Sequence, residues 1–561
     1  MKIKTIAIFF YCILHSQNLV YANKPHIIVI MADDMGHYDV GFQGSNQIPT
    51  PNLDALAYNG IILNRFYTQN SCTPSRTAFL TGNYPIRSGM QGYPLKAGEN
   101  RALPHDMPTM PEQMKKLGYK THLVGKWHLG AATRNNTPTG RGFDSHFGYW
   151  HGLIGYFNYL SFRREHNHTL TRGLDLHDNL KPVWSGQGKY ATNLFTERAL
   201  EIIDNHNVEV PLFLILSHLA PHAGKDGLEL EVPNATLTNL KYSYINDPRR
   251  RRYADMVNLM DESTGRIVQK LNQKNMLQNS IVLFFSDNGG QPVGLYQNSA
   301  SNWPLRGTKF VDFEGGVRTA AAIFSPLFKK RGYVNTQFFH LTDWLPTFYS
   351  AAGGNLKDLG MIDGIDQWKV LTENLTSSRT EILINIDEVK NSSTIIGNNG
   401  RHKLIQGTFG HDYFDKYFGS SDHQTPGTPP YNHENVLKSV TNQAITSVVD
   451  GTMTREKIDE LRSQTDLSWC RDFNKTFDFK CTDGCLFDLI DDPCETTNIL
   501  EKEVEIREEL KRKLEKYRLV LVPQRNKDFD LSSDPIFYNN TWCTWLDDDW
   551  CFKTTNIERI Y

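Results

Sequence analysis

The sequence predicts an α/β domain with helices on both faces of a mostly parallel sheet, followed by a smaller α+β domain. Short apolar, β-branched runs at 26–32, 211–222 and 281–289 are typical of fully buried parallel strands. Helical patterns at 189–203 and 252–271 lie between these runs, and strands that alternate with helices favour a parallel sheet. Ligands of such a domain are expected at the carboxyl ends of the strands.

Each predicted helix has an apolar stripe at helical spacing. In 252–271 the stripe contains Tyr253, Met256, Val257, Met260, Ile267 and Leu271. The character of the chain changes after Val370, where short β-like pieces and loop-rich segments precede a charged helix at 503–521. We place the domain boundary near residue 371, which predicts a larger domain over 23–371 and a smaller domain over 372–561. The stripe of the last helix contains Ile506, Leu510, Leu514, Tyr517 and Leu521.

The first 22 residues have the pattern of a secretory signal peptide. Lys2 and Lys4 precede an apolar run, and residues 20–22 offer a cleavage site. An N-terminal anchor helix is the alternative. The sequence therefore predicts the secretory pathway, with lysosomal and secreted destinations both open. Seven N-x-S/T sequons suit a lumenal glycoprotein, at Asn135, Asn167, Asn234, Asn374, Asn391, Asn474 and Asn539.

The charge balance indicates neither nucleic acid nor an anionic membrane as a partner. The 561 residues carry a formal net charge of -2, which provides no electrostatic attraction to a polyanion. After the predicted signal peptide no stretch is apolar enough to span a bilayer. The oligomeric state stays open at this stage.

The cysteines fall into two groups. Cys12 lies within the predicted signal peptide, and Cys72 has no cysteine near it. In an oxidising compartment, Cys72 is either a buried inert thiol, an intermolecular link or a chemical group. The remaining even set predicts up to three disulfides with open connectivity, among Cys470, Cys481, Cys485, Cys494, Cys543 and Cys551.

Acidic residues follow two of the predicted strands. Asp33 and Asp34 close one strand, and Asp287 and Asn288 close another. Because neighbouring strands lie only about 5 Å apart, these four side chains can converge on one hard cation such as Ca²⁺ or Mg²⁺. Either motif alone would more simply be a turn. Both together, each after a buried strand, favour a metal site.

Cationic side chains gather beyond the same strand ends. A short strand leads to Lys126 and His128, the run at 211–222 ends with His222, and a later loop supplies Lys309. Singly, each would be a solvated lysine or a structural histidine. Around a metal ion they suit an anionic tetrahedral group, whose negative charge must be neutralised as a leaving oxygen departs.

The stretch C-T-P-S-R-T-A-F-L-T-G at 72–82 resembles the sulfatase signature, C-x-P-S-R followed by x-x-x-L-x-G. DDMGHYDVGFQG, GYKTHLVGKWHLG, FSDNGG, NWPLRGTK, FEGGVR, TDWLPT and LFDLIDDPCE resemble further blocks of that family in the family's order. The chain is most similar to the arylsulfatase B group, N-acetylgalactosamine-4-sulfatase-like enzymes, from about residue 25 to residue 500. The resemblance implies an alkaline-phosphatase-like α/β/α sandwich and hydrolysis of sulfate monoesters.

The resemblance also implies the cofactors. Cys72 would be oxidised to Cα-formylglycine by the formylglycine-generating enzyme, and its hydrate would attack sulfur and then expel sulfate. One Ca²⁺ ion would be bound by Asp33, Asp34, Asp287 and Asn288, with the modified Cys72 completing its shell.

The same resemblance implies roles for the other site residues. Arg76 would hold the diol, and Lys126 and Lys309 would neutralise sulfate oxygens. His128 would act as the base, and His222 would donate a proton to the leaving oxygen.

Several alternatives stay open on the sequence alone. His218 competes with His222, because SHLAPH departs locally from the group, and the N-terminal cysteines of arylsulfatase B relatives are missing. The substrate is either a galactosamine sulfate of a glycosaminoglycan or a small aryl, steroid or plant-glucoside sulfate. A phosphatase or phosphodiesterase of the same fold would need a Ser or Thr nucleophile and two zinc ions. An inactive binding protein is the third class, against which the intact set of site residues argues.

Overall fold

The computed structural model describes residues 24–164, 170–407, 413–419, 425–471, 480–481 and 484–547. The predicted signal peptide, the sequons at Asn167 and Asn474, and Cys551 lie outside these residues. Within the described ranges no helix combines the length and the apolar character needed to cross a membrane.

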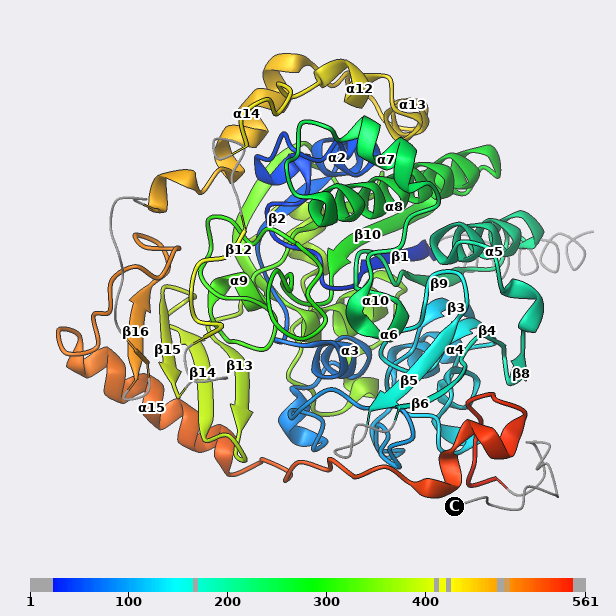
Figure 1. Ribbon diagram of the computed structural model, residues 1–561. Helices are drawn as coiled ribbons and strands as arrows, with labels where there is room; N and C mark the ends of the chain where they lie inside the picture. Colours follow the sequence, from blue (N-terminus) through cyan, green and yellow to red (C-terminus); the bar gives the residue numbers. More distant parts are fainter. Residues whose placement is uncertain are drawn as a thin grey trace, which may run out of the picture.

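In the described part of the chain, ten strands form one mostly parallel sheet at the centre of the larger domain (Figure 1). The order is β12-β2-β11-β10-β1-β9-β3-β4-β7-β8. Four neighbouring parallel strands form the middle: β10 (Ser280–Ser286), β1 (His26–Ala32), β9 (Leu212–Ser217) and β3 (Lys120–Lys126). The others are β2 (Ile61–Tyr67), β4 (Ser145–Tyr149), β7 (His177–Asp178), β8 (Lys181–Pro182), β11 (Ala321–Phe324) and β12 (Tyr333–His340).

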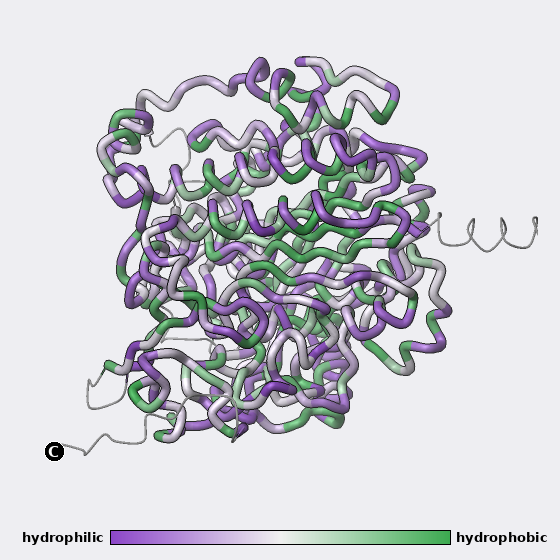
Figure 2. Tube along the Cα trace, turned by 90° about the vertical axis from the view of Figure 1, so that its right-hand side faces the viewer, coloured by the Kyte–Doolittle hydropathy of each residue, from purple (hydrophilic) through white to green (hydrophobic). Residues whose placement is uncertain are grey.

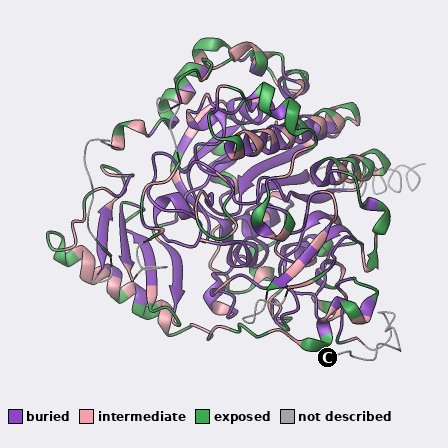
Figure 3. Ribbon diagram, viewed as in Figure 1, coloured by how far each residue is buried: buried purple, intermediate pink, exposed green. Residues whose placement is uncertain are grey.

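The central strands are apolar throughout because both faces of the sheet are covered. Ile28 and Ile30 of β1 pack into one hydrophobic core, whereas Ile27 and Val29 pack into a second core on the opposite face. Successive side chains of a strand point to opposite faces, so a strand between two cores cannot alternate with polar residues. Figure 2 shows the hydrophobic trace of these strands inside the molecule, and Figure 3 shows their burial.

Helices cover both faces of the sheet, as predicted. On one face lie α2 (Pro51–Asn59), α5 (Ala191–Asn205), α8 (Pro248–Gln273) and α13 (Val440–Thr446). The other face carries α3 (Cys72–Thr81), α4 (Met110–Lys116), α10 (Trp344–Ala351) and α11 (Trp368–Glu373). The other α-helices of the described residues are α6 (Lys225–Leu228), α7 (Ala235–Lys241), α9 (Glu314–Val317), α12 (His433–Leu437), α14 (Arg455–Thr465) and α15 (Val504–Arg518).

The smaller domain is an antiparallel sheet covered by one helix. Its strands are β13 (Ile382–Asp387), β14 (Ser392–Gly397), β15 (His402–Gln406) and β16 (Cys485–Asp488). Helix α15 packs against this sheet with Leu510 and Leu514 fully buried, and Ile506, Tyr517 and Leu521 pack partly buried beside them. The predicted α/β/α sandwich with a smaller C-terminal α+β domain is confirmed. Residue 371, near which the boundary was predicted, lies inside α11, where Val370 and Leu371 pack into a core of the larger domain.

Two segments of the C-terminal third return to the larger domain (Figure 1). Helix α13 lies beside α2 and α8, α12 lies beside α2, and α14 packs near β12; Ile445 and Ile458 join the core of that face. After α15, residues 519–547 run back to a hairpin formed by β5 (Leu160–Arg164) and β6 (Leu170–Leu174), and the backbone N of Trp542 donates to Leu174 O at 2.9 Å.

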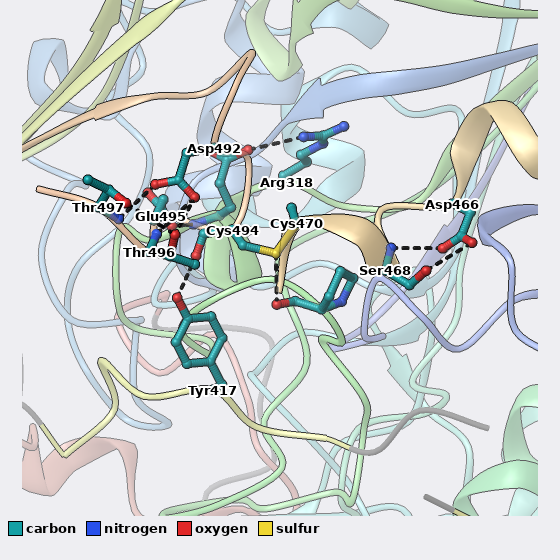
Figure 4. Close-up of a disulfide and its surroundings, with 12 residues drawn as sticks. Arg318, Tyr417, Asp466, Ser468, Cys470, Asp492, Cys494, Glu495, Thr496 and Thr497 are labelled. Atoms are coloured by element: carbon teal, nitrogen blue, oxygen red, sulfur yellow. Dashed lines mark hydrogen bonds and ion pairs between the residues drawn. A yellow bond between two sulfur atoms is a disulfide. The ribbon is translucent and has the colours of Figure 1, made fainter. Parts of the chain in front are cut away.

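The predicted disulfides are present in the described residues. Cys470 pairs with Cys494 and Cys481 pairs with Cys485. Cys543 is also disulfide-bonded. Figure 4 shows the first pair, beside which the Tyr417 hydroxyl donates to Cys494 O at 2.7 Å. This pair joins the end of the α14 segment to the loop that follows β16.

A buried ion-pair cluster joins the two domains. Lys403 Nζ of β15 lies 3.1 Å from a carboxylate oxygen of Glu314 in α9 and 2.9 Å from one of Glu495. All three side chains are fully buried. A buried charge needs a partner, because water cannot solvate it there.

Replacing Lys403 by methionine is expected to lower the free energy of unfolding by about 3–5 kcal/mol, because Glu495 loses a buried counter-charge and Glu314 keeps only the more distant Arg318, at 3.5 Å. Thermal or urea unfolding measures the change. The control is Lys438→Met, which removes an exposed i,i+4 pair with Glu434 and should cost less than about 1 kcal/mol. Equal stabilities of the two variants would contradict this role for Lys403.

Candidate active site

The polar ends of the four central strands meet at one edge of the sheet. Asp33 and Asp34 directly follow β1, and Asp287 and Asn288 directly follow β10. Lys126 is the last residue of β3. Since β10, β1, β9 and β3 are consecutive parallel neighbours, their carboxyl ends lie side by side. The sheet therefore assembles side chains that are more than 250 residues apart in the chain.

These residues fit one hard cation. Ligand atoms of Asp33, Asp34, Cys72 and Asp287 all lie within 4.8 Å of one another, and each residue is buried. Asn288 Nδ2 donates to Asp34 Oδ1 at 2.7 Å, while its Oδ1 is buried without a hydrogen-bond partner among the described residues. A buried oxygen without a hydrogen bond lowers the free energy of unfolding by about 1–3 kcal/mol. Carboxylate and amide oxygens are the ligands that Ca²⁺ prefers.

Two buried lysines face two of the carboxylates. Lys126 Nζ lies 2.7 Å from Asp33, and Lys309 Nζ lies 2.7 Å from Asp34. Burial opposes ionisation of Asp33 and Asp34, but the lysines beside them hold the pKa of each below its usual value. Asp33 and Asp34 therefore carry the negative charge that a metal ligand needs.

Helix α3 positions Cys72 and Arg76 on one face. Cys72 is its first residue, and Arg76 lies one turn later. Arg76 reaches Asp287 at 2.8 Å and the Ser217 hydroxyl, at the end of β9, at 2.7 Å. The Cys72 Sγ lies 3.6 Å from Asp33 Oδ1, and burial raises the pKa of the thiol to about 12. As a thiol, Cys72 is therefore protonated at neutral pH and a weak nucleophile.

His128 is held so that one ring nitrogen can accept a proton. Its Nε2 lies 2.7 Å from Leu95 O, which can only accept, so Nε2 carries the hydrogen. Its buried Nδ1 has no hydrogen-bond partner in the described part of the chain. Burial lowers the pKa of His128 well below its usual value, which leaves the ring neutral with a lone pair on Nδ1.

The side chains of His218 and His222, which follow β9, point to different regions of the molecule. His222 lines the cavity above Cys72, with Nε2 3.3 Å from Asp34 Oδ2 and Nδ1 2.7 Å from Ala223 O. The ring of His218 instead reaches the Ser263 hydroxyl of α8 at 3.2 Å, on the face of the sheet that α8 covers. His218 is not among the residues that line the cavity. Strand β9 ends at Ser217, and the turn between the two histidines contains Pro221.

A cavity of about 600 Å³ opens above this cluster. Cys72, His128, His222 and Lys309 line it, whereas Arg76 and Lys126 do not. Its walls include the stacked rings of Tyr93 and Phe310, 5.7 Å apart, and also Lys96, His151, Phe162, Arg163, Arg164 and Tyr296. This volume lies within the range of sites for small organic ligands and exceeds what a sulfate ion alone requires.

The sequence did not predict two residues of this site, His151 on the cavity wall and Ser217, which accepts a hydrogen bond from Arg76. His151 lines the cavity and follows β4 by two residues, in the same relation to its strand as the predicted site residues have to theirs. The short run SHFGY at 145–149 was the available signal. Ser217, which holds Arg76, carries no local signal at all.

The comparison with protein families agrees with this geometry. The family model described as Sulfatase matches residues 25–354, from the start of β1 to the end of α10. The chain belongs to the sulfatase family. It is therefore a sulfuric ester hydrolase, and its cluster at the strand ends is the candidate active site of a sulfatase.

Curated relatives extend the similarity over most of the sulfatase. Mouse arylsulfatase J is 33% identical over 539 residues, which cover 95% of this chain and 82% of that protein. Mouse N-acetylgalactosamine-6-sulfatase is 31% identical over 357 residues, with 61% of this chain and 65% of that protein covered. The predicted family is confirmed, and the finer resemblance to the arylsulfatase B group stays a prediction.

Solved structures share the fold of this sulfatase. The structure described as Ps i-CgsB has a TM-score of 0.67 at 24% identity and covers 90% of this chain and 94% of its own. The PsFucS1 sulfatase from Pseudoalteromonas sp. has a TM-score of 0.61 at 21% identity, with coverage of 92% and 94%. At these identities the likeness concerns the fold alone.

Proposed function

We propose that this sulfatase hydrolyses sulfate monoesters of sugars, with N-acetylgalactosamine 4-sulfate as the first candidate and small aryl or plant-glucoside sulfates as the alternative. The observation that carries the proposal is the single cavity that joins Cys72 to His128, His222 and Lys309. Its volume of about 600 Å³ accommodates a sugar ring beside the sulfate. Mouse N-acetylgalactosamine-6-sulfatase, among the relatives, is named for a sugar sulfate.

Two groups would complete the site. Conversion of Cys72 to Cα-formylglycine would supply a hydrated aldehyde as a nucleophile that regenerates itself. One Ca²⁺ ion, held by Asp33, Asp34, Asp287, Asn288 and the modified Cys72, would supply positive charge beside the sulfate oxygens. The unpartnered Asn288 Oδ1 and the close carboxylates support this ligand set.

The other residues would stabilise negative charge and transfer protons. Arg76, anchored by Asp287 and Ser217, would hold the hydroxyls on the modified Cys72. Lys126 and Lys309 would stabilise the negative charge of the sulfate in the transition state. The lone pair on His128 Nδ1 would accept a proton when sulfate is released, and His222 would donate one to the leaving oxygen.

The secretory pathway fits this function. The described sequon residues Asn135, Asn234, Asn374, Asn391 and Asn539 are all exposed, as glycosylation requires. Disulfides form in the same compartment. We propose that the formylglycine-generating enzyme acts on the chain during maturation there, and that the mature enzyme is lysosomal or secreted.

The deciding experiment is a desulfation assay on a panel of esters. The panel contains N-acetylgalactosamine 4-sulfate and 6-sulfate as disaccharides, nitrophenyl sulfate, a steroid sulfate and a phosphate monoester. Ion chromatography measures the released anion. Fastest release from a sugar sulfate is expected. Phosphate release above sulfate release would refute the proposal in favour of a phosphatase.

Metal analysis gives a separate prediction. We expect one calcium ion per chain, lost in Asp33→Ala, because that change removes a ligand and leaves Lys126 without its buried counter-charge. Activity and thermal stability should both fall, with a stability loss of about 3–5 kcal/mol. Glu515→Gln, at an exposed carboxylate of α15, is the control that keeps its calcium. Two zinc ions per chain would contradict the assignment.

A further inference from the structure

A buried carboxylate fixes the ring of His151 on the cavity wall. His151 Nδ1 lies 2.8 Å from Asp175 Oδ2, and the backbone N atoms of Trp150 and His151 donate to the same carboxylate at 3.0 Å each. Burial opposes ionisation of Asp175, but the two histidines beside it, His151 and His177, hold its pKa well below the usual value. An ionised carboxylate can only accept, so the hydrogen of the neutral His151 ring lies on Nδ1 and its Nε2 is an acceptor.

The acceptor atom of His151 has no hydrogen-bond partner among the described residues. The side chain is only 3% exposed and lines the cavity, and its one printed hydrogen bond is made by Nδ1. The Nε2 atom is not fully enclosed by protein atoms, so it is accessible from the cavity. A ligand that displaces water from this wall must offer a donor to Nε2, because a buried acceptor left without a hydrogen bond weakens binding.

His151 lies next to His128, the base of the proposed reaction. The backbone N of His128 donates to Trp150 O at 3.0 Å, which joins the end of β3 to the residue before His151. The residue after it, Gly152, is so close to His128 that a Cβ added there would lie 3.0 Å from the His128 ring. A ligand whose sulfate is bound at Cys72 would therefore bring its sulfated sugar, and not a more distant part of the molecule, to His151.

The C-terminal segment holds His151 in this position. The ring of Trp542 lies 4.9 Å from the ring of His151, and Trp542 O lies 3.0 Å from His177 Nε2. Trp542 is fully buried, and its Nε1 donates to Ser161 O of β5 at 3.1 Å. Figure 1 shows this segment beside β5 and β6. Because the His151 ring is packed and hydrogen-bonded in this way, the direction of Nε2 is fixed before a ligand binds, which reduces the entropy cost of binding.

We propose that His151 is a specificity-determining residue that accepts a hydrogen bond from a hydroxyl or the acetamido N–H of the sulfated sugar. The inference rests on the proposed function, because that function places the reacting sulfate at Cys72. It makes sugar sulfates with a free donor near the ester better ligands than aryl sulfates, which offer none. A site that hydrogen-bonds a substrate donor discriminates strongly against an analogue that lacks it, because the polar group of the site is then left unpaired.

Equilibrium binding to the Cys72→Ala variant tests this role without turnover. The parent probe is methyl N-acetylgalactosaminide 4-sulfate, and its analogues lack the 3-hydroxyl, the 6-hydroxyl or the acetamido group. Calorimetry should show that at least one analogue binds about 10-fold more weakly than the parent. Addition of His151→Leu, which removes the acceptor, should weaken binding of the parent by a similar factor and binding of that analogue by less than about two-fold.

Two further variants, each combined with Cys72→Ala, separate this role from packing. His151→Gln should restore most of the discrimination, because its amide oxygen can accept a hydrogen bond in place of Nε2. His122→Leu makes the same change on β3, at a histidine that contacts the Ser145 hydroxyl and does not line the cavity, and it should leave the dissociation constants unchanged. Equal binding of the parent and all three analogues, or equal losses for all of them in His151→Leu, would overturn the role of His151.

The proposed function is tested separately by sulfate release. If the wild-type enzyme released no sulfate from the parent probe, the function would fail even where the binding differences were found. Absence of any binding by the parent would overturn both the function and the role of His151.

Discussion

Cys72→Ser is expected to fold normally and to lose turnover by at least about 10⁴-fold. Serine occupies slightly less volume than cysteine at the first position of α3, and its hydroxyl can donate to Asp33 as the thiol does. It cannot carry two hydroxyls on one carbon, and the proposed release of sulfate requires the second one. Sulfate release and thermal unfolding, measured on the same preparation, separate the two effects.

Two measurements make this prediction decisive. Thr77→Ser, a buried change on the same helix, should retain activity and thereby control for disturbance of α3. Peptide mass spectrometry should find a lower mass for the wild-type peptide that contains residue 72, because a thiol has become an aldehyde. Active protein with an intact, alkylatable thiol at full occupancy would refute the formylglycine mechanism.

His222→Ala is expected to reduce hydrolysis of a sugar sulfate about 10²- to 10⁴-fold more than hydrolysis of nitrophenyl sulfate. A sugar alkoxide is very basic and needs a proton as the S–O bond breaks, whereas nitrophenolate is stable without one. His222 lies on the cavity wall beside Asp34, so its ring would be near the leaving oxygen of an ester whose sulfate is bound at Cys72. The measurement is kcat/KM for both esters with both proteins.

His218→Ala is the matched control. His218 lies four residues earlier, and its ring reaches Ser263 of α8, away from the residues that line the cavity. Its losses should be equal for the two esters, because they reflect packing alone. Equal losses for His222→Ala would mean that His222 binds sulfate and is not the acid. If only His218→Ala affected the two esters differently, His218 would be the proton donor. That result would contradict the assignment of His222, which rests on the geometry of the cavity.

Local sequence patterns determined the fold class and the cluster of Asp33, Asp34, Asp287 and Asn288 at the strand ends. A strand packed on both faces is apolar at every position. The apolar runs before Asp33 and Asp287 could therefore be recognised as buried strands without knowing which strands lie next to them. The carboxyl ends of neighbouring parallel strands lie at the same end of the sheet. The residues that follow these strands are therefore close together. The signature around Cys72 then identified the family.

Only the tertiary structure decided which of two histidines faces the cavity and what surrounds the substrate. The direction of a side chain after a strand end depends on the loop and on the elements that pack against it. His218 and His222 are therefore indistinguishable in one sequence. The wall around His151 is formed by β4, β5 and the C-terminal segment, whose members are up to about 390 residues apart. No local propensity encodes that contact, because it arises when residues 519–547 bury Trp542 against the larger domain.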